Sequence, residues 1–262
     1  MSELQKKMEM LADRLFMFDE VVIAFSGGAD STFLLAMAEY VRGNDILAVT
    51  IAGPNFAMEE LAGAYKFCEK KGIPHLTINL EQEILDAINK NDEERCYHCK
   101  NTIFSFIKEN IGPIVLEGSN LDDLSDYRPG RKAIKELGVI SPLEEIGFTK
   151  AEIREGLKAL NIPTWNKPAL ACLASRIPTG EEITKEKLKQ IENCEKIMKE
   201  MGFTHFRVRY HGELARIEVG QDELRRFCDR EVMEKVSQRI KKEGFKYVSL
   251  DLEGYQMGSM NK

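Results

Sequence analysis

The 262-residue sequence lacks the marks of a membrane or secreted protein. No window approaches the roughly 18 consecutive apolar residues of a membrane span. The first residues, MSELQKK, do not build the basic and then apolar pattern of a signal peptide. Disorder is excluded as the main state, because 43% of the residues are hydrophobic and can bury a core. We therefore expect a folded cytoplasmic protein.

Basic charge is also scarce. The chain has 37 Lys and Arg against 43 Asp and Glu, which gives a net charge of −6. Residues 1–180 carry a net charge of −7, and residues 181–262 carry +1. Neither part has the basic excess that binding to a nucleic-acid backbone usually requires. Nucleic acid is therefore disfavoured as the main ligand, and a small molecule is favoured.

The six cysteines fall into two groups. Three occupy apolar positions of helical patterns and are predicted to be buried: Cys68, Cys194 and Cys228. The other three do not fit such patterns. Cys96 and Cys99 form a C-x-x-C, and Cys172 lies apart from them. Without a secretion signal, this second set indicates metal or redox chemistry more than a structural disulfide.

Strand and helix patterns alternate in the first 180 residues. Apolar runs predict buried strands at 21–25, 46–51 and 114–116, with a further strand near 75–79. Helical patterns lie between them, at 4–17, 31–42, 57–71, 81–89 and 100–109. This succession predicts an α/β domain with a doubly wound, mainly parallel sheet over residues 1–180.

A turn-rich segment at 161–184 separates this domain from a different pattern. A helix is predicted at 184–201, strands at 206–210, 214–219 and 247–250, and helical segments over 221–242. Residues 181–262 are therefore expected to form a small α+β domain.

A glycine-rich turn, Ser26-Gly27-Gly28-Ala29-Asp30-Ser31, follows the first predicted strand and leads into a helix. In this setting backbone N–H groups and the positive end of the helix converge on an anion. Ser26 and Ser31 add hydroxyl donors, and Asp30 is placed to cap the helix or to orient a metal-bound phosphate. The turn is not a Walker A loop, because no lysine follows the glycines. It predicts a phosphate-binding loop.

A second polar cluster, 117–123, follows the predicted strand 114–116. Ligands of an open α/β sheet bind at the carboxyl ends of its strands. Gly118 and Asn120 suit a close approach of the backbone, and Asp122 or Asp123 is a candidate ligand of Mg²⁺. A turn with helix caps is the alternative interpretation.

Five arginines are the candidate anchors for an anionic substrate. An acidic domain needs local positive charge to hold such a molecule, and a guanidinium binds a carboxylate in bidentate geometry. Arg128, Arg131 and Arg176 lie in segments predicted near the carboxyl edge of the sheet. Arg207 and Arg209 lie on a strand of the second domain, where a solvent-facing strand edge is the alternative.

Several motifs together resemble the LarE type of sulfur transferase. S-G-G-x-D-S is the signature of the wider PP-loop ATP pyrophosphatase superfamily. The more specific segments are 95–100 (RCYHCK), 118–123 (GSNLDD), 126–130 (DYRPG), 167–178 (KPALACLASRIP) and 250–260 (LDLEGYQMGSM). The resemblance extends from about residue 5 to 260.

The resemblance implies an enzyme that cleaves ATP between the α- and β-phosphates, with Mg²⁺ as the expected ion. A ring carboxylate of pyridinium-3,5-biscarboxylic acid mononucleotide would be adenylated, and sulfur would then replace AMP. The product belongs to the synthesis of the nickel-pincer nucleotide of lactate racemase. A homo-oligomer is expected.

The source of the sulfur depends on the cysteines. Some members of the family sacrifice the sulfur of one cysteine at the position of Cys172, whereas those with an added C-x-x-C resemble iron–sulfur enzymes. The presence of Cys96, Cys99 and Cys172 favours a 4Fe–4S cluster with one iron left open. Zinc with His75 or His98 as a fourth ligand is one alternative, and a metal-free site is the other.

Other functions share these features. A tRNA thiolase has the same loop and the three-cysteine option, and an amidating ligase has the loop. Outside enzymes, a nucleotide-binding redox sensor could use the C-x-x-C as a dithiol switch.

Overall fold

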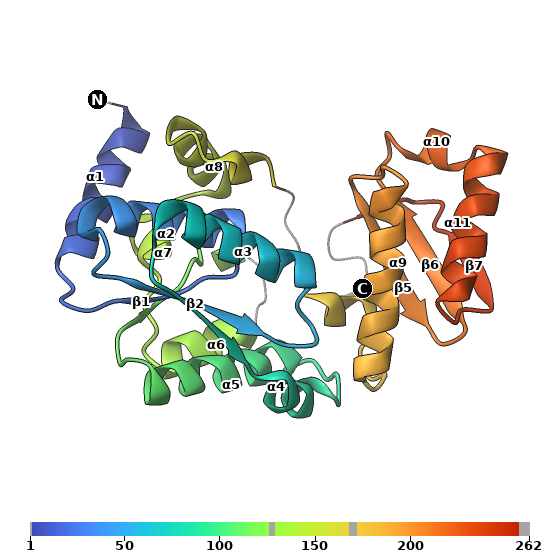
Figure 1. The fold of residues 1–262 in the computed structure, drawn as a ribbon, viewed down its shortest axis with the longest axis horizontal. Helices are drawn as coiled ribbons and strands as arrows, with labels where there is room; N and C mark the ends of the chain where they lie inside the picture. Colours follow the sequence, from blue (N-terminus) through green and yellow to red (C-terminus); the bar gives the residue numbers. More distant parts are fainter. Residues whose placement is uncertain (1, 126–128, 168–171, 257–262) are drawn as a thin grey trace. The chain divides into compact units, whose positions relative to one another are not determined.

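The computed structural model describes residues 2–125, 129–167 and 172–256, and the chain divides into two compact units (Figure 1). The first unit comprises Met1–Ile88 and Glu93–Leu170, and the second comprises Asn89–Asp92 and Ala171–Lys262. Asn91 ties its short segment to the second unit, because its side-chain amide donates to the carbonyls of Pro178 and Glu181 at 2.7 and 2.9 Å. Cys172 therefore belongs to the second unit, whereas the sequence placed the boundary after residue 180.

A four-stranded parallel sheet forms the centre of the first unit, in the order β3-β2-β1-β4. Its strands are β1 (Val22–Ala24), β2 (Leu47–Ala52), β3 (His75–Asn79) and β4 (Val115–Leu116). Ile23, Ala48 and Val115 are fully buried, as expected for strands with helices on both faces. The predicted doubly wound α/β fold is confirmed.

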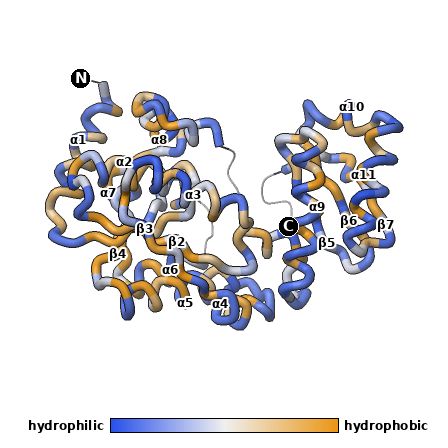
Figure 2. Tube along the Cα trace, viewed as in Figure 1, coloured by the Kyte–Doolittle hydropathy of each residue, from blue (hydrophilic) through white to orange (hydrophobic). Residues whose placement is uncertain are grey.

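Eight helices surround this sheet within the described part of the unit. They are α1 (Glu3–Phe16), α2 (Ala29–Arg42), α3 (Met58–Lys71), α4 (Glu81–Ile88), α5 (Arg95–Asn110), α6 (Pro129–Glu136), α7 (Pro142–Ile146) and α8 (Lys150–Ala159). Helices α2 and α3 lie on one face of the sheet, and α4, α5 and α6 lie on the other (Figure 1). Orange apolar strands run between these helices in Figure 2, and the core is buried there.

The sequence did not predict α6, α7 or α8, and it began α5 too late. Helices α6 to α8 are short, so periodicity reveals them poorly. Thr149 and Glu152 form a capping box at the start of α8. Helix α5 begins at Arg95 because α6 packs on its first turns: a Cβ at Gly130 would lie 3.2 Å from the Cys96 carbonyl oxygen.

The second unit is a small α+β fold. Its sheet pairs β5 (Phe206–His211) with β6 (Leu214–Val219) antiparallel, and β6 with β7 (Tyr247–Leu250) parallel. The helices are α9 (Lys185–Glu200), α10 (Leu224–Phe227) and α11 (Arg230–Lys242), and a 3₁₀ turn, η3 (Leu173–Arg176), follows Cys172. Alternating residues of β5 and β6 form the core with α9 and α11.

The prediction that three cysteines are buried is confirmed for two of them and wrong for the third. Cys68 and Cys194 are buried, and burial raises the pKa of their thiols to about 11 and about 12. Cys228 is exposed instead. It ends a helix of four residues in which the inward position belongs to Phe227. A short helix has no continuous apolar face, so the i, i+4 spacing to Leu224 misled the prediction.

Among the described residues, no helix is both long enough and apolar enough to cross a membrane.

Candidate active site

The loop after β1 presents an open helix N-terminus. Gly28 is the N-cap of the 14-residue helix α2 in an extended conformation, with no side-chain cap. Gly27 has a φ of 73°, a region that favours glycine. Ser26 and Ser31 lie next to each other, with their hydroxyl oxygens 3.0 Å apart. N–H groups and hydroxyls therefore gather at the positive end of α2, the arrangement that binds phosphate.

Asp30 lies in the first turn of α2 and faces another carboxylate. The pKa of Asp30 is raised to about 6, first by burial and then by the negative charge of Asp123, while Lys150, Arg154 and a hydrogen bond from Asn120 oppose the shift. The Asn120 amide donates to Asp30 Oδ2 at 3.2 Å. A carboxyl group with such a pKa lies in a site that lacks sufficient positive charge.

Asn120 organises this part of the sheet edge. Its side chain is fully buried, its backbone N–H donates to Asp123 Oδ2 and its side-chain oxygen accepts from the N–H of Asp122. Asp122 Oδ2 in turn accepts from the backbone N–H of Lys150 at the start of α8. Asp123 is buried and its carboxylate contacts Lys150 Nζ at 2.9 Å. Asp123 is the carboxylate whose charge acts on Asp30, whereas Asp122 accepts a hydrogen bond from the first residue of α8.

Gly118 allows the two loops to meet. A Cβ at this position would lie 2.9 Å from the backbone nitrogen of Ser31 and 3.1 Å from the Asp30 carbonyl carbon. Any side chain would push the 117–123 segment away from the phosphate-binding loop. The sequence predicted a close backbone approach here, and its partner is the loop itself.

Two cations that the sequence did not single out lie at the loop. Lys167 Nζ donates to the carbonyl of Gly27 at 2.8 Å and to Glu60 Oε2 at 2.6 Å. Arg154 donates to the carbonyls of Trp165 and Lys167 at 2.6 and 2.8 Å. Both lie far in sequence from the loop, so spacing gave no signal for them.

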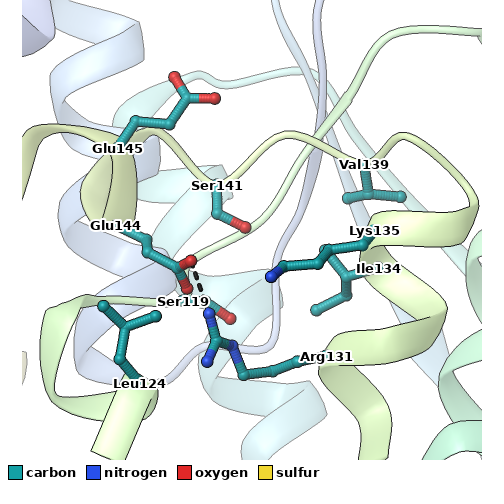
Figure 3. Close-up of a pocket in the computed structure, with 9 residues that line it drawn as sticks. All are labelled: Ser119, Leu124, Arg131, Ile134, Lys135, Val139, Ser141, Glu144 and Glu145. Atoms are coloured by element: carbon teal, nitrogen blue, oxygen red, sulfur yellow. Dashed lines mark hydrogen bonds and ion pairs between the residues drawn. The ribbon is translucent and has the colours of Figure 1, made fainter.

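A pocket of about 280 Å³ lies beside the 117–123 segment. Ser119, Ser141 and Arg131 point toward it in Figure 3, where Arg131 donates to Glu144 at 2.7 Å. Glu117, buried next to it, accepts from the hydroxyls of Ser119 and Ser141. Arg131 thus lies at the predicted edge of the sheet, in an ion pair. Arg128 lies outside the described residues.

The C-x-x-C occupies the first turns of α5. Cys96 and Cys99 are three residues apart and so share one side of the helix. Cys96 is exposed, and Cys99 is partly buried beside the Asn55 amide, whose nitrogen lies 3.8 Å from the sulfur. In the described part of the chain, no three His, Cys, Asp or Glu side chains gather closely enough to hold a metal ion. The three-cysteine site remains a prediction.

The arginines of the second unit form a buried network. Arg176 is 1% exposed and makes a bidentate pair with Glu195 at 2.8 and 2.9 Å. It also donates to the carbonyl of Cys172 at 3.1 Å. Arg209 pairs in the same way with Glu218. The alternative of a solvent-facing strand edge is therefore wrong for Arg207 and Arg209, which are 8% and 5% exposed.

Arg207 lies in the same network. Burial lowers the pKa of its guanidinium, and the positive charge of Arg176 lowers it further. Its guanidinium stacks over the Tyr255 ring, 4.8 Å from the centroid. Arg176, Arg207 and Arg209 thus lie close enough to repel one another, although Glu195 and Glu218 neutralise part of their charge.

Comparison with known proteins gives full-length matches. The NAD synthase family model matches residues 4–114, which include the phosphate-binding loop. Pyridinium-3,5-bisthiocarboxylic acid mononucleotide synthase of Lactiplantibacillus plantarum is 34% identical over 100% of this chain and 96% of its own. The chain belongs to the LarE family. The predicted resemblance is confirmed, and the protein is an ATP-dependent sulfur transferase of the PP-loop type.

Two further relatives also match along almost the whole chain. An uncharacterized protein of Synechocystis sp. is 38% identical over 99% of this chain and 98% of its own. An uncharacterized protein of Methanocaldococcus jannaschii is 33% identical over 96% and 98%. All three relatives match both units, so the similarity includes the second unit as well as the loop.

Proposed function

We propose that this enzyme adenylates a carboxylate of pyridinium-3,5-biscarboxylic acid mononucleotide and then replaces AMP with sulfur. The observation that carries the proposal is the full-length similarity to a synthase named for the bisthiocarboxylic acid, together with the phosphate-binding geometry after β1. A bisthiocarboxylic acid differs from a biscarboxylic acid by sulfur in place of carboxylate oxygen. That exchange requires an activated carboxylate, which ATP provides.

The loop geometry supports adenylation. With the β- and γ-phosphates at the start of α2, a substrate carboxylate oxygen attacks the α-phosphorus. The bond from this phosphorus to the bridging oxygen breaks, and its electron pair leaves with pyrophosphate. Donors that already converge on the phosphates stabilise this charge without reorganisation.

The two facing carboxylates fit Mg²⁺. Asp30 and Asp123 raise the cost of ionising each other, and a divalent cation between them and the phosphates would remove this cost. Asp30 and Asp123 would hold the ion, because Asp123 is the carboxylate whose charge acts on Asp30. Bound Mg²⁺ would offset phosphate charge.

The donor set Cys96, Cys99 and Cys172 fits a 4Fe–4S cluster in its chemistry. Cysteine sulfurs are the usual ligands of such clusters, and Cys96 and Cys99 occupy the first turns of α5 on one side of the helix. Such a cluster, when bound, would supply a renewable sulfur donor.

The arginines are proposed to hold the anionic substrate. Arg207 and Arg209, with Arg176 beside them, concentrate positive charge that a phosphate or carboxylate would offset. Arg131 and Arg128 are the corresponding candidates in the first unit. We further expect a homo-oligomer that works in the cytoplasm.

Product analysis tests the reaction. The protein is incubated with Mg-ATP, sulfide and pyridinium-3,5-biscarboxylic acid mononucleotide, and nucleotides and pyridinium products are separated. We expect AMP, pyrophosphate and a thiocarboxylate, each dependent on the substrate. Release of ADP and orthophosphate, or turnover with bulk tRNA in place of the mononucleotide, would contradict the proposal.

Iron analysis tests the cluster separately. The protein is reconstituted without oxygen, and iron, sulfide and visible absorption are measured for wild type and single Cys→Ala variants. We expect loss of the cluster in the Cys96, Cys99 and Cys172 variants and retention in the controls Cys68, Cys194 and Cys228. Multiple turnovers by metal-free protein would contradict the proposal that a cluster supplies the sulfur.

A further inference from the structure

Lys167 is the cation that touches the phosphate-binding loop. Its ammonium group contacts the Gly27 carbonyl at 2.8 Å and the Glu60 carboxylate at 2.6 Å. The Lys167 and Glu60 side chains are 24% and 17% exposed, so the ammonium lies at the surface of the loop and not beneath it. An ammonium has three N–H donors, and these contacts use two of them.

The backbone of Lys167 is held in place before any ligand binds. Arg154 donates to the carbonyl oxygens of both Trp165 and Lys167, which fixes the end of the segment that follows α8. Glu60 comes from the first turn of α3, and the loop passes close to that turn, since a Cβ at Gly27 would lie 3.3 Å from the Glu60 carbonyl oxygen. A side chain anchored from both ends loses little entropy when it binds a ligand.

The surroundings of the loop are short of positive charge. Asp30 lies in the first turn of α2, Asn120 contacts both Asp30 and Asp123, and the loop carries no lysine of its own. ATP adds several negative charges to this site. Lys150 already pairs with Asp123, and Arg154 is engaged with two carbonyls.

We propose that Lys167 binds the pyrophosphate end of ATP and replaces the lysine that the loop lacks. This inference rests on the proposed function of the loop and adds a residue to it. The neutral Gly27 carbonyl is a weak partner that a phosphate oxygen can replace, because an ammonium bonds more strongly to an anion. Glu60 holds the ammonium in position. When the α-phosphorus bond breaks, Lys167 stabilises the charge that collects on the leaving pyrophosphate.

Calorimetric titration of the full-length protein tests this role, with pyrophosphate and AMP as separate probes. In Lys167→Met we expect pyrophosphate to bind about 10- to 100-fold more weakly, the loss of one charge-assisted bond. AMP lacks the β- and γ-phosphates, so its affinity should change less than about threefold. Lys167→Arg keeps the charge and should recover part of the affinity for pyrophosphate.

Lys158→Met is the matched control, because Lys158 lies in α8 over the Trp165 ring and not at the loop. It should bind pyrophosphate like wild type. Equal weakening of AMP and pyrophosphate in Lys167→Met would overturn the proposal, since it would show a general effect on loop shape. Unchanged pyrophosphate binding in folded Lys167→Met would overturn it too. If wild type itself failed to bind pyrophosphate, the proposed function of the loop would fail instead.

Discussion

The two units bury charge in opposite ways. In the second unit, Arg209 and Glu218 are 6% and 1% exposed and form a bidentate pair. At the loop of the first unit, the carboxylates of Asp30 and Asp123 face each other, and the pKa of Asp30 rises to about 6. Paired charges hold a fold together, whereas like charges raise each other's energy. This repulsion is consistent with the cation and the phosphate proposed for the loop, and it costs stability.

The largest expected effect is the loss of enzymatic turnover in Asp30→Asn. The change removes the carboxylate proposed to face Mg²⁺ and keeps the shape of the side chain. We expect turnover to fall by about 10²- to 10³-fold or more, the usual cost of one electrostatic contact to a transition state. The rate of AMP formation measures it, with circular dichroism as the control for folding. Near wild-type turnover would exclude a catalytic role for Asp30.

Removal of a paired charge should instead damage the fold. In Arg209→Ala, Glu218 loses its bidentate partner and keeps a contact with Arg216 at 3.1 Å, and we expect the free energy of unfolding to fall by up to about 3–5 kcal/mol. Urea denaturation measures this loss. Arg230→Ala removes an ion pair whose side chains are 90% and 58% exposed, and it should cost less than about 1 kcal/mol. Equal losses in the two variants would show that burial does not set the strength of these pairs.

Asp30→Asn should also stabilise the protein in a pH-dependent way. The pKa of Asp30 is about 6 in the folded state against an ordinary 3.8, so the folded state binds the proton more tightly. Ionisation therefore destabilises the fold, and the penalty grows as pH rises from about 4 to about 7. After allowance for partial exposure, we expect Asp30→Asn to gain about 1–2 kcal/mol at pH 7 and almost nothing at pH 4.

Urea unfolding in EDTA across this pH range measures the gain. If the free energies of unfolding of the variant and wild type differed by the same amount at every pH, repulsion between the carboxylates would be excluded as the cause.

The smallest effect, with the opposite sign, is expected at His75. Burial lowers the pKa of this imidazole, and its Nε2 lies 2.8 Å from the Thr50 hydroxyl. The unfolded chain then binds a proton more readily, so stability falls as pH drops below about 6.5. His75→Gln should flatten this part of the stability curve by less than the Asp30 effect. If the free energy of unfolding of His75→Gln changed with pH between 7 and 5.5 as it does in wild type, the prediction would be contradicted.

Local sequence patterns predicted much of this structure. Apolar runs located the strands of both units, and the turn after β1 was identified from two glycines between a strand and a helix. Gly118 was predicted to lie where backbone approaches closely, and its neighbour is Ser31. Short helices such as α7 were missed, because they are stabilised by neighbours and show little periodicity of their own.

The sequence by itself determined the fold class, the phosphate-binding loop and the family, because these follow from residues adjacent along the chain. Only the tertiary structure decided which distant side chains meet. Asn120 reaches Asp30 and Lys167 reaches Gly27 because the β-strands end at one edge of the sheet and the segment after α8 returns there. Arg209 on β5 pairs with Glu218 on β6 because these strands are neighbours in the sheet and the two residues are diagonally opposite. Contacts between residues remote in sequence depend on register and packing, which no local pattern of residues encodes.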